Sequence, residues 1–311
     1  MTVDKNPNEP EIRWLPDRKR LHFQHGPIDL IVEAFGEQDE VRWAYEQAAG
    51  RFKTVLRELV GELPALRQSA ERTKQRFDSP IARAMVNSVK PYAPAFVTPM
   101  AAVAGAVADE MLLELTRDRQ LDKAYVNNGG DIALWLSAGT EFEAGLVANA
   151  DNPDILGRIR ISESTPVRGL ATSGWRGRSL SLGIADSVTV LAKSAAEADV
   201  AATLIANAVD LPDNEKIGRC PAQQLAPDSD LGEWLVTASV ARLNESEISL
   251  ALDKGMQKAE TYYSKDLFYA AALCLGGEVR FLGEPVIAPV LLAHESKPLQ
   301  HTGQGGREQY A

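Results

Sequence analysis

Histidine is scarce in this chain. The 311 residues contain four, at positions 22, 25, 294 and 301, so none lies between residues 26 and 293. A Ser-His-Asp triad or a His-rich metal site in the central region would have to borrow its histidine from the ends. Acid–base chemistry in that region must therefore use carboxylates, Lys or Cys.

Cysteine is scarcer still, with only Cys220 and Cys274. No Cys-x-x-Cys motif or Cys/His cluster occurs, which argues against a structural zinc site. So sparse a set is typical of a reducing compartment, with both thiols buried. Arg219 could lower the pKa of Cys220, but a buried structural thiol is the favoured interpretation.

Long apolar runs and an apolar leader are also missing. No window of about 18 apolar residues predicts a membrane span, and residues 1–20 lack the apolar segment of a signal peptide. The net charge of −10 argues against a general nucleic-acid-binding surface. We therefore expect a cytoplasmic protein with no membrane or nucleic-acid partner. A local basic pocket for phosphate remains compatible with this charge.

The hydrophobic pattern mixes strand pairs and helix pairs without regular βαβ alternation. This favours an α+β fold, an antiparallel sheet with helices packed on one face. Residues 210–230 are expected to form an irregular connection. Helices are expected at 41–60, 80–89, 99–116, 195–209 and 246–263, and strands at 20–24, 28–34, 123–127, 132–137, 141–149, 158–162, 186–192, 233–243, 267–275 and 278–282.

The segment Asn127-Asn128-Gly129-Gly130-Asp131 follows an apolar stretch. Paired glycines allow positive φ and expose backbone N–H groups that can bind phosphate or another anion. Asp131 would then orient the loop, contact a ribose hydroxyl or act as a catalytic carboxylate. The same residues also fit a simple turn, because Asn-Gly is a common turn signal.

A second polar segment contains Thr172, Ser173, Gly174, Arg176 and Arg178. We expect a turn at residues 171–174 with the two arginines beyond it. Guanidinium groups suit carboxylates and phosphates, so anion binding is the favoured interpretation.

Covalent catalysis at this segment is less favoured. Thr172 and Ser173 are candidate nucleophiles, but no histidine close in sequence could activate them. Asp186 is a candidate catalytic carboxylate that would support them in space. Trp175 would either stack on a planar ring or fill the core.

Asp199 and Thr203 stand four residues apart on the helix expected from residue 195, whose start is marked by Ser194 and Glu197. They therefore share a face, and a carboxylate with a hydroxyl makes a candidate Mg²⁺ site. Spacing alone favours a plainer interpretation, in which Asp199 lies on the surface and Thr203 bonds back to its own helix.

Taken together, these motifs resemble the ApbE superfamily, whose founding members are Mg²⁺-dependent FAD:protein FMN transferases. Their pattern is a Gly-Gly-Asp loop after a strand, a Thr-Ser-Gly turn, and Asp-x-x-x-Thr on a helix. Here these are Gly129–Asp131, Thr172–Gly174, and Asp199 with Thr203. The chain most resembles an uncharacterised cytoplasmic ApbE-like branch that shares TPMAAVAGAVAD, VNNGGDIAL and ATSGWRGRSLSLGIADSVTVLA.

This resemblance implies a domain over residues 19–285, made of two intertwined T-fold-like halves with the site between them. Residues 1–18 and 286–311 would be flexible tails. The resemblance also implies Mg²⁺ ligands at Asp199 and Thr203 and flavin-nucleotide contacts at the Gly-Gly-Asp loop. Mg²⁺ and FAD or FMN are therefore the candidate cofactors or ligands.

Two departures from the transferase pattern indicate that protein flavinylation is lost. Ala104-Gly105 stand where the transferases have Lys-Gly. Only residues 175–185 fill the segment where they carry a His-containing insert.

The leading hypothesis is an ApbE-like protein that binds a small anionic, nucleotide-like or flavin-like ligand, with Mg²⁺ as the candidate metal. One alternative is a hydrolase or transferase acting on a small cyclic or heterocyclic substrate. Another is a non-catalytic flavin- or nucleotide-binding partner of a redox enzyme. A homodimer is expected, because paired T-fold units often bury sheet edges by assembly.

Overall fold

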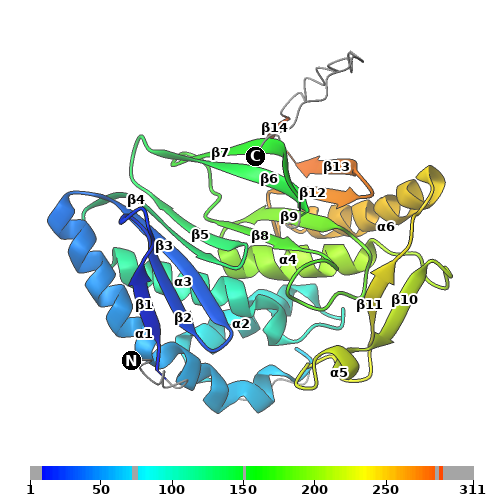
Figure 1. The fold of residues 1–311 in the computed structure, drawn as a ribbon, viewed down its shortest axis with the longest axis horizontal. Coiled ribbons are helices and arrows are strands. Elements are labelled where there is room, and N and C mark those ends of the chain that lie inside the picture. Colours follow the sequence, from blue (N-terminus) through cyan, green and yellow to red (C-terminus); the bar gives the residue numbers. More distant parts are fainter. Residues whose placement is uncertain (1–8, 72–75, 150–151, 284–286, 290–311) are drawn as a thin grey trace, which may run out of the picture.

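The computed structural model describes residues 9–71, 76–149, 152–283 and 287–289. A nine-stranded antiparallel sheet forms the centre of the molecule (Figure 1), in the order β1-β2-β3-β4-β5-β8-β9-β12-β13. Its strands are β1 (Glu11–Trp14), β2 (Leu21–His25), β3 (Ile28–Gly36), β4 (Leu121–Asn128), β5 (Asp131–Leu136), β8 (Gly169–Ser173), β9 (Ser187–Ala192), β12 (Ala270–Leu275) and β13 (Glu278–Gly283).

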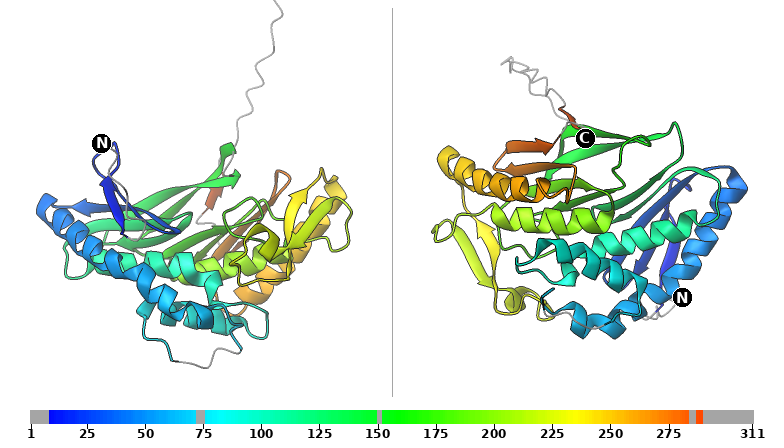
Figure 2. Two further views of the ribbon diagram at one scale, coloured as in Figure 1. Left: turned by 60° about the horizontal axis from the view of Figure 1, so that its bottom comes forward. Right: turned by 180° about the vertical axis from the view of Figure 1, so that it is seen from behind.

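The long helices lie on one face of this sheet (Figure 2), so the expected α+β class is confirmed. They are α1 (Gln38–Leu66), α2 (Pro80–Val89), α3 (Val103–Thr116), α4 (Ala195–Ala208) and α6 (Glu245–Tyr263). Shorter helical segments are η1 (Lys90–Tyr92), η2 (Pro99–Ala102) and α5 (Ala222–Leu225). Within the described residues, no helix is both long enough and apolar enough to cross a membrane.

A second, smaller sheet covers part of the opposite face. It contains β6 (Glu141–Asn149), β7 (Asn152–Ser162) and β14 (Ile287–Pro289). Buried residues of this layer, among them Ile159 and Ile161, pack against the outward-facing Leu134, Leu170 and Leu191 of the large sheet. A separate ribbon pairs β10 (Ile217–Pro221) with β11 (Leu235–Val240).

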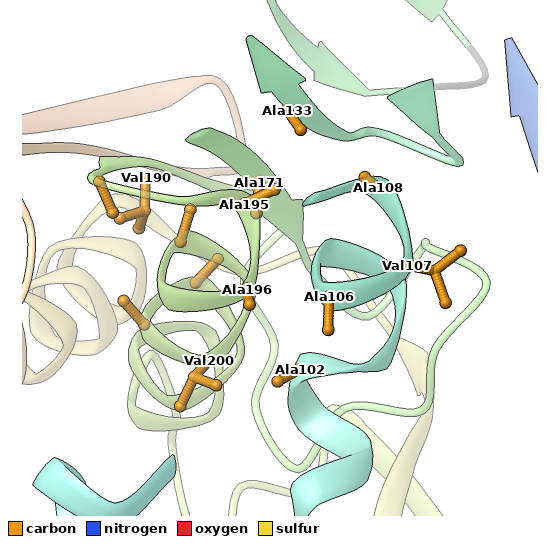
Figure 3. Close-up of a cluster of buried hydrophobic side chains, with 14 of the residues drawn as sticks. Ala102, Ala106, Val107, Ala108, Ala133, Ala171, Val190, Ala195, Ala196 and Val200 are labelled. Atoms are coloured by element: carbon orange, nitrogen blue, oxygen red, sulfur yellow. The ribbon is translucent and has the colours of Figure 1, made fainter. Parts of the chain in front are cut away.

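Small residues allow α3 and α4 to pack closely beneath the sheet (Figure 3). A Cβ on Gly105 of α3 would lie 2.3 Å from the carbonyl oxygen of Ala195, the first residue of α4. Ala102, Ala106 and Ala196 line the same contact (Figure 3). The alanine- and glycine-rich sequence of these helices is thus explained by backbone-to-backbone packing.

Local sequence signals fix several helix ends. The side chain of Ser194 accepts a hydrogen bond from the N–H of Glu197, so the predicted start of this helix, α4, is confirmed. Ser79 likewise accepts the N–H of Ala82 and caps α2. Helix α1 runs beyond the predicted residues 41–60 and includes Pro64. It continues because Leu66 beyond that proline is fully buried in the core.

Expectations about four segments need correction. Residues 171–173 belong to strand β8 rather than to a turn, because β9 pairs with them on one side. The stretch 210–230 contains β10 and α5. Residues 11–14, expected in a flexible tail, pair with β2. Residues 287–289, in the other expected tail, pair with β7, while residues 1–8 and 290–311 lie outside the described residues.

The two cysteines are free thiols in different surroundings. Cys274 in β12 is buried, as expected, and burial raises its pKa to about 11. Cys220 is only partly buried. Its neighbour Arg219 forms an ion pair with Asp210 and donates to the Leu182 carbonyl.

Candidate functional site

The Gly-Gly segment forms the tight turn between β4 and β5. Gly129 and Gly130 have φ of +66° and +115°, and the side-chain oxygen of Asn127 accepts the N–H of Gly130 at 2.9 Å. The turn interpretation of this motif is therefore correct at the level of local structure. Asn127 and Asn128 point to opposite faces of the sheet because side chains alternate along a strand.

An inner cavity of about 200 Å³ lies between the helix-facing side of this sheet end and the helices α3 and α4. Strands β4, β5 and β8 supply one wall, α4 supplies another, and the tip of the β2–β3 hairpin closes it with Pro27. Its polar lining includes Asn128, Gly129, Asp131, Thr172, Ser173, Gly174, Arg178, Asp199 and Thr203.

Two buried carboxylates dominate the electrostatics of the inner cavity. Burial and the nearby charge of Asp199 hold the pKa of Asp131 well above its ordinary range, against a hydrogen bond from the Thr172 N–H. Burial also raises the pKa of Asp199 to about 7, although the N–H groups of Gly105 and Ala104 lower it. Two such carboxylates favour either a proton or a cation between them.

Asp199 also stabilises a helix end, which the sequence did not reveal. It accepts the N–H of Gly105, in the first turn of α3, at 3.1 Å. Asp109 of α3 in turn accepts the N–H groups of Ala195 and Ala196, at the start of α4, each at 2.9 Å. The two helices thus cap each other, and the interpretation of Asp199 as a surface residue is wrong.

The oxygen donors of the inner cavity fit a hard cation such as Mg²⁺. Asp131, Asp199 and the hydroxyl of Thr203 all face it, and Mg²⁺ usually keeps several waters beside one or two carboxylates. Thr203 forms no hydrogen bond back to its helix within the described residues. In the same residues no group of three or more His, Cys, Asp or Glu side chains could hold a metal ion.

An outer pocket of about 380 Å³ lies on the opposite side of the large sheet, beneath β6 and β7. Its apolar wall contains Ile132, Ala144, Ile159 and Leu170. The hydroxyls of Thr172 and Thr189 line it and lie 2.8 Å apart. This lining suits an uncharged, ring-sized group that offers hydrogen-bonding atoms along one edge.

The two cavities meet at the end of β8. Both are lined by Gly129, Thr172, Ser173, Gly174 and Gly177. Only glycine fits at position 174, because a Cβ there would lie 2.4 Å from the carbonyl oxygen of Asp186. The remaining predicted site residues, Asn127, Gly130, Arg176 and Asp186, line the outer pocket. The structure therefore gathers every predicted site residue around these two cavities.

Arg176 and Asp186 are paired with each other at the rim of the outer pocket. The Nε of Arg176 lies 3.0 Å from Asp186 Oδ1, and its guanidinium lies over the Trp175 ring, 4.4 Å from the centroid. Asp186 Oδ2 accepts the N–H of Gly276 at 2.7 Å. Both oxygens of this candidate base are thus already engaged in hydrogen bonds.

The candidate nucleophiles have no activating base beside them in the described residues. Within the described part of the chain, the Thr172 hydroxyl bonds only to that of Thr189, and no histidine lines either cavity. The absence of central histidines from the sequence thus carries through to the site.

Sequence reasoning missed residues that come from distant segments. Pro27 lies about 100 positions before the Gly-Gly turn and carried no motif. Thr189 could have been found, because its place in β9 alternates with the buried Val188 and Val190.

The chain is similar in sequence to curated proteins of other organisms. A UPF0280 protein of Methanococcus vannielii is 40% identical over 153 residues, which cover 47% of this chain and 58% of the relative. A UPF0280 protein of Methanobrevibacter smithii is 40% identical over 114 residues, 36% of this chain and 46% of the relative. The chain thus spans about half the length of the curated relatives it matches.

Among solved structures, the apo form of the flavinyl transferase ApbE of Pseudomonas stutzeri matches with a TM-score of 0.40 and 10% identity, over 91% of this chain and 97% of that one. The ApbE protein of Thermotoga maritima matches with a TM-score of 0.35 and 15% identity, over 81% and 77%. A family model described as AbpE bacteria matches residues 12–281. The chain therefore belongs to this family, and the ApbE-like membership expected from the sequence is confirmed.

Proposed function

We propose that this protein binds a small two-part ligand, nucleotide-like or flavin-like, with an anionic group and an uncharged ring. The observation that carries the proposal is the pair of joined cavities with contrasting linings. The inner cavity offers carboxylates and, at its mouth, the guanidinium of Arg178. The outer pocket offers apolar walls with hydroxyls. One ligand passing the shared glycines Gly129 and Gly174 would reach both.

The charged end of the ligand and Mg²⁺ belong together in the inner cavity. Asp131, Asp199 and Thr203 would hold the ion, whose charge relieves the repulsion between the two carboxylates. The bound ion would in turn attract an anionic group, which Arg178 would contact at the mouth of the cavity. Bound Mg²⁺ would thereby neutralise the anionic group of the ligand.

Protein flavinylation is absent from this proposal. Ala104-Gly105 stand where the resemblance places the Lys-Gly pair of the transferases, and Gly105 is enclosed by the backbone of Ala195. Thr172 has a hydroxyl rather than a base as its partner. These contacts favour binding, or chemistry that uses a carboxylate, over a covalent step at Thr172.

The test is thermal unfolding with FMN, FAD or ADP, each with and without Mg²⁺. At a ligand concentration about 100 times Kd, the Tm should rise by about 5 °C. Asp131→Asn should abolish the Mg²⁺-dependent part of this rise. Asp122→Asn is the matched control, because that exposed carboxylate lies on β4 outside both cavities. Silence with all three ligands, or a rise that Asp131→Asn leaves intact, would contradict the proposal.

A further inference from the structure

Arg178 stands at the mouth of the inner cavity with little packing to hold it. Its side chain is 72% exposed, and its Nη1 lies 3.6 Å from where a Cβ of Gly129 would be. A long exposed side chain loses considerable rotamer entropy when a ligand immobilises it. A partner that already orients Arg178 would reduce this cost.

The N-terminal strands supply such a partner through a chain of contacts. Arg178 Nη2 lies 3.5 Å from Asp29 Oδ2 at the start of β3. Asp29 Oδ1 lies 2.7 Å from Nε2 of His22 in β2. The other ring nitrogen of His22, Nδ1, accepts a hydrogen bond from Arg13 Nε of β1 at 3.0 Å.

The donors and acceptors in this chain leave a single arrangement for a neutral His22. Arg13 can only donate, so His22 Nδ1 accepts and the ring proton stands on Nε2. The Nε2–H then donates to Asp29 Oδ1 and leaves Oδ2 for Arg178. Since both ring nitrogens are engaged, His22 orients Asp29 and does not serve as a base for the cavity.

We propose that Asp29 is a positioning residue that holds Arg178 over the Gly129 turn. His22 orients Asp29 through its hydrogen bond, and Arg13 in turn orients His22. The inference rests on the proposed function, because the anionic group of the ligand is what Arg178 would contact. It adds the N-terminal meander, formed by strands β1, β2 and β3, to the site. Pro27, in the turn between β2 and β3, already lines the inner cavity.

The charge state of Asp29 agrees with this role. Burial raises its pKa, but the contacts with His22 and Arg178 outweigh burial, and the pKa is lowered overall. Asp29 is thus ionised at neutral pH and can hold a guanidinium.

A double-mutant cycle tests whether Asp29 acts through Arg178. FMN affinity, with Mg²⁺, is measured by calorimetry for the wild type, Asp29→Asn, Arg178→Gln and the double variant. We expect Asp29→Asn to weaken binding about fivefold and Arg178→Gln about tenfold. The double variant should bind like Arg178→Gln alone. Riboflavin, which lacks the phosphate, should bind all four proteins equally.

Asp17→Asn is the matched control, since Asp17 also pairs with an arginine of the N-terminal meander but lines neither cavity. It should leave FMN affinity unchanged. Asp29→Glu should restore most of the affinity that Asp29→Asn loses, which a fold defect would not do.

The two failures can be told apart. If the wild type binds none of FMN, FAD and ADP, the proposed function fails and the inference falls with it. Suppose instead that the wild type binds FMN, but Asp29→Asn weakens binding by the same factor in the wild type and in Arg178→Gln. The proposed function then stands. Asp29 then acts by another route, and the inference is overturned.

Discussion

Buried aspartates rather than surface charges set the chemistry of this molecule at the scale of single residues. Asp109 illustrates the cost of such burial. Burial raises its pKa from 3.8 to about 6, although the N–H groups of Ala196 and Ala195 and the Ser194 hydroxyl lower it. Desolvation of the charged form therefore outweighs helix capping here.

The raised pKa of Asp109 predicts a pH dependence of stability. Between about pH 4 and pH 6 the folded protein keeps a proton that the unfolded chain releases. The contribution of Asp109 to the free energy of unfolding is thus full below pH 4 and is lost as the pH rises through 6, by up to about 3 kcal/mol. In Asp109→Asn this contribution is absent at every pH. The difference in free energy of unfolding between the wild type and this variant should therefore become smaller as the pH rises from about 4 through 6.

Urea unfolding at pH 4.5, 6 and 7.5 with EDTA would measure this gap. Asp122→Asn, at an exposed position, should show the same gap to the wild type at every pH. A gap for Asp109→Asn that stays constant or widens with pH would show that this carboxyl is charged throughout.

The sequence could predict the residues of the site but not their partners. Spacing marked Asp131 and Asp199, because each lies within a short motif. Asp109 bonds to residues 86 and 87 positions away, so no local pattern could connect it with the start of α4. The capping role of Asp199 was hidden for the same reason.

At the scale of elements, the contact between α3 and α4 depends on glycine. Gly105→Ala would place a Cβ 2.3 Å from the carbonyl oxygen of Ala195, a backbone atom that cannot rotate away. We expect it to lower the free energy of unfolding by about 1–3 kcal/mol. It should also disturb the N–H that Gly105 donates to Asp199.

Gly61→Ala in α1 is the matched control, because nothing lies within 4 Å of its new Cβ and the residue is exposed. There the better helix propensity of alanine should raise stability by about 1 kcal/mol. Chemical denaturation of both variants gives the comparison. A Gly105→Ala protein as stable as Gly61→Ala would mean that the two helices can separate at no cost.

Sequence patterns predicted those elements that carry their own signals. Helix α2 begins at Pro80 after a serine cap, and α4 begins after Ser194. Strand β8 was missed because its polar end, Thr172-Ser173, is held by pairing with β9 alone and shows no hydrophobic alternation of its own. Strand β10 was missed because its ladder with β11 joins segments separated by a long irregular connection.

At the scale of the whole molecule, the large sheet and the main core extend through both halves of the chain. The N-terminal half supplies β1 to β5 of this sheet, and the C-terminal half supplies β8, β9, β12 and β13. Strand β5 pairs with β8, which joins the N-terminal strands to the C-terminal ones. One buried cluster includes Phe23 and Phe52 as well as Leu252 and Leu273. The reciprocal caps of α3 and α4 lie at the junction. Neither half can therefore lose its structure without exposing the core of the other.

This continuity predicts that the two halves unfold together, as expected for the single domain inferred over residues 19–285. Chains longer than about 150 residues often populate intermediates, so the prediction is not trivial. Variants that keep only Trp135 of β5 or only Trp175 beyond β8 report on each half by fluorescence. Their urea midpoints should coincide with each other and with the loss of far-UV circular dichroism. Separate midpoints would mean that the caps between α3 and α4 and the β5–β8 pairing are too weak to couple the halves, and that the chain folds as two units.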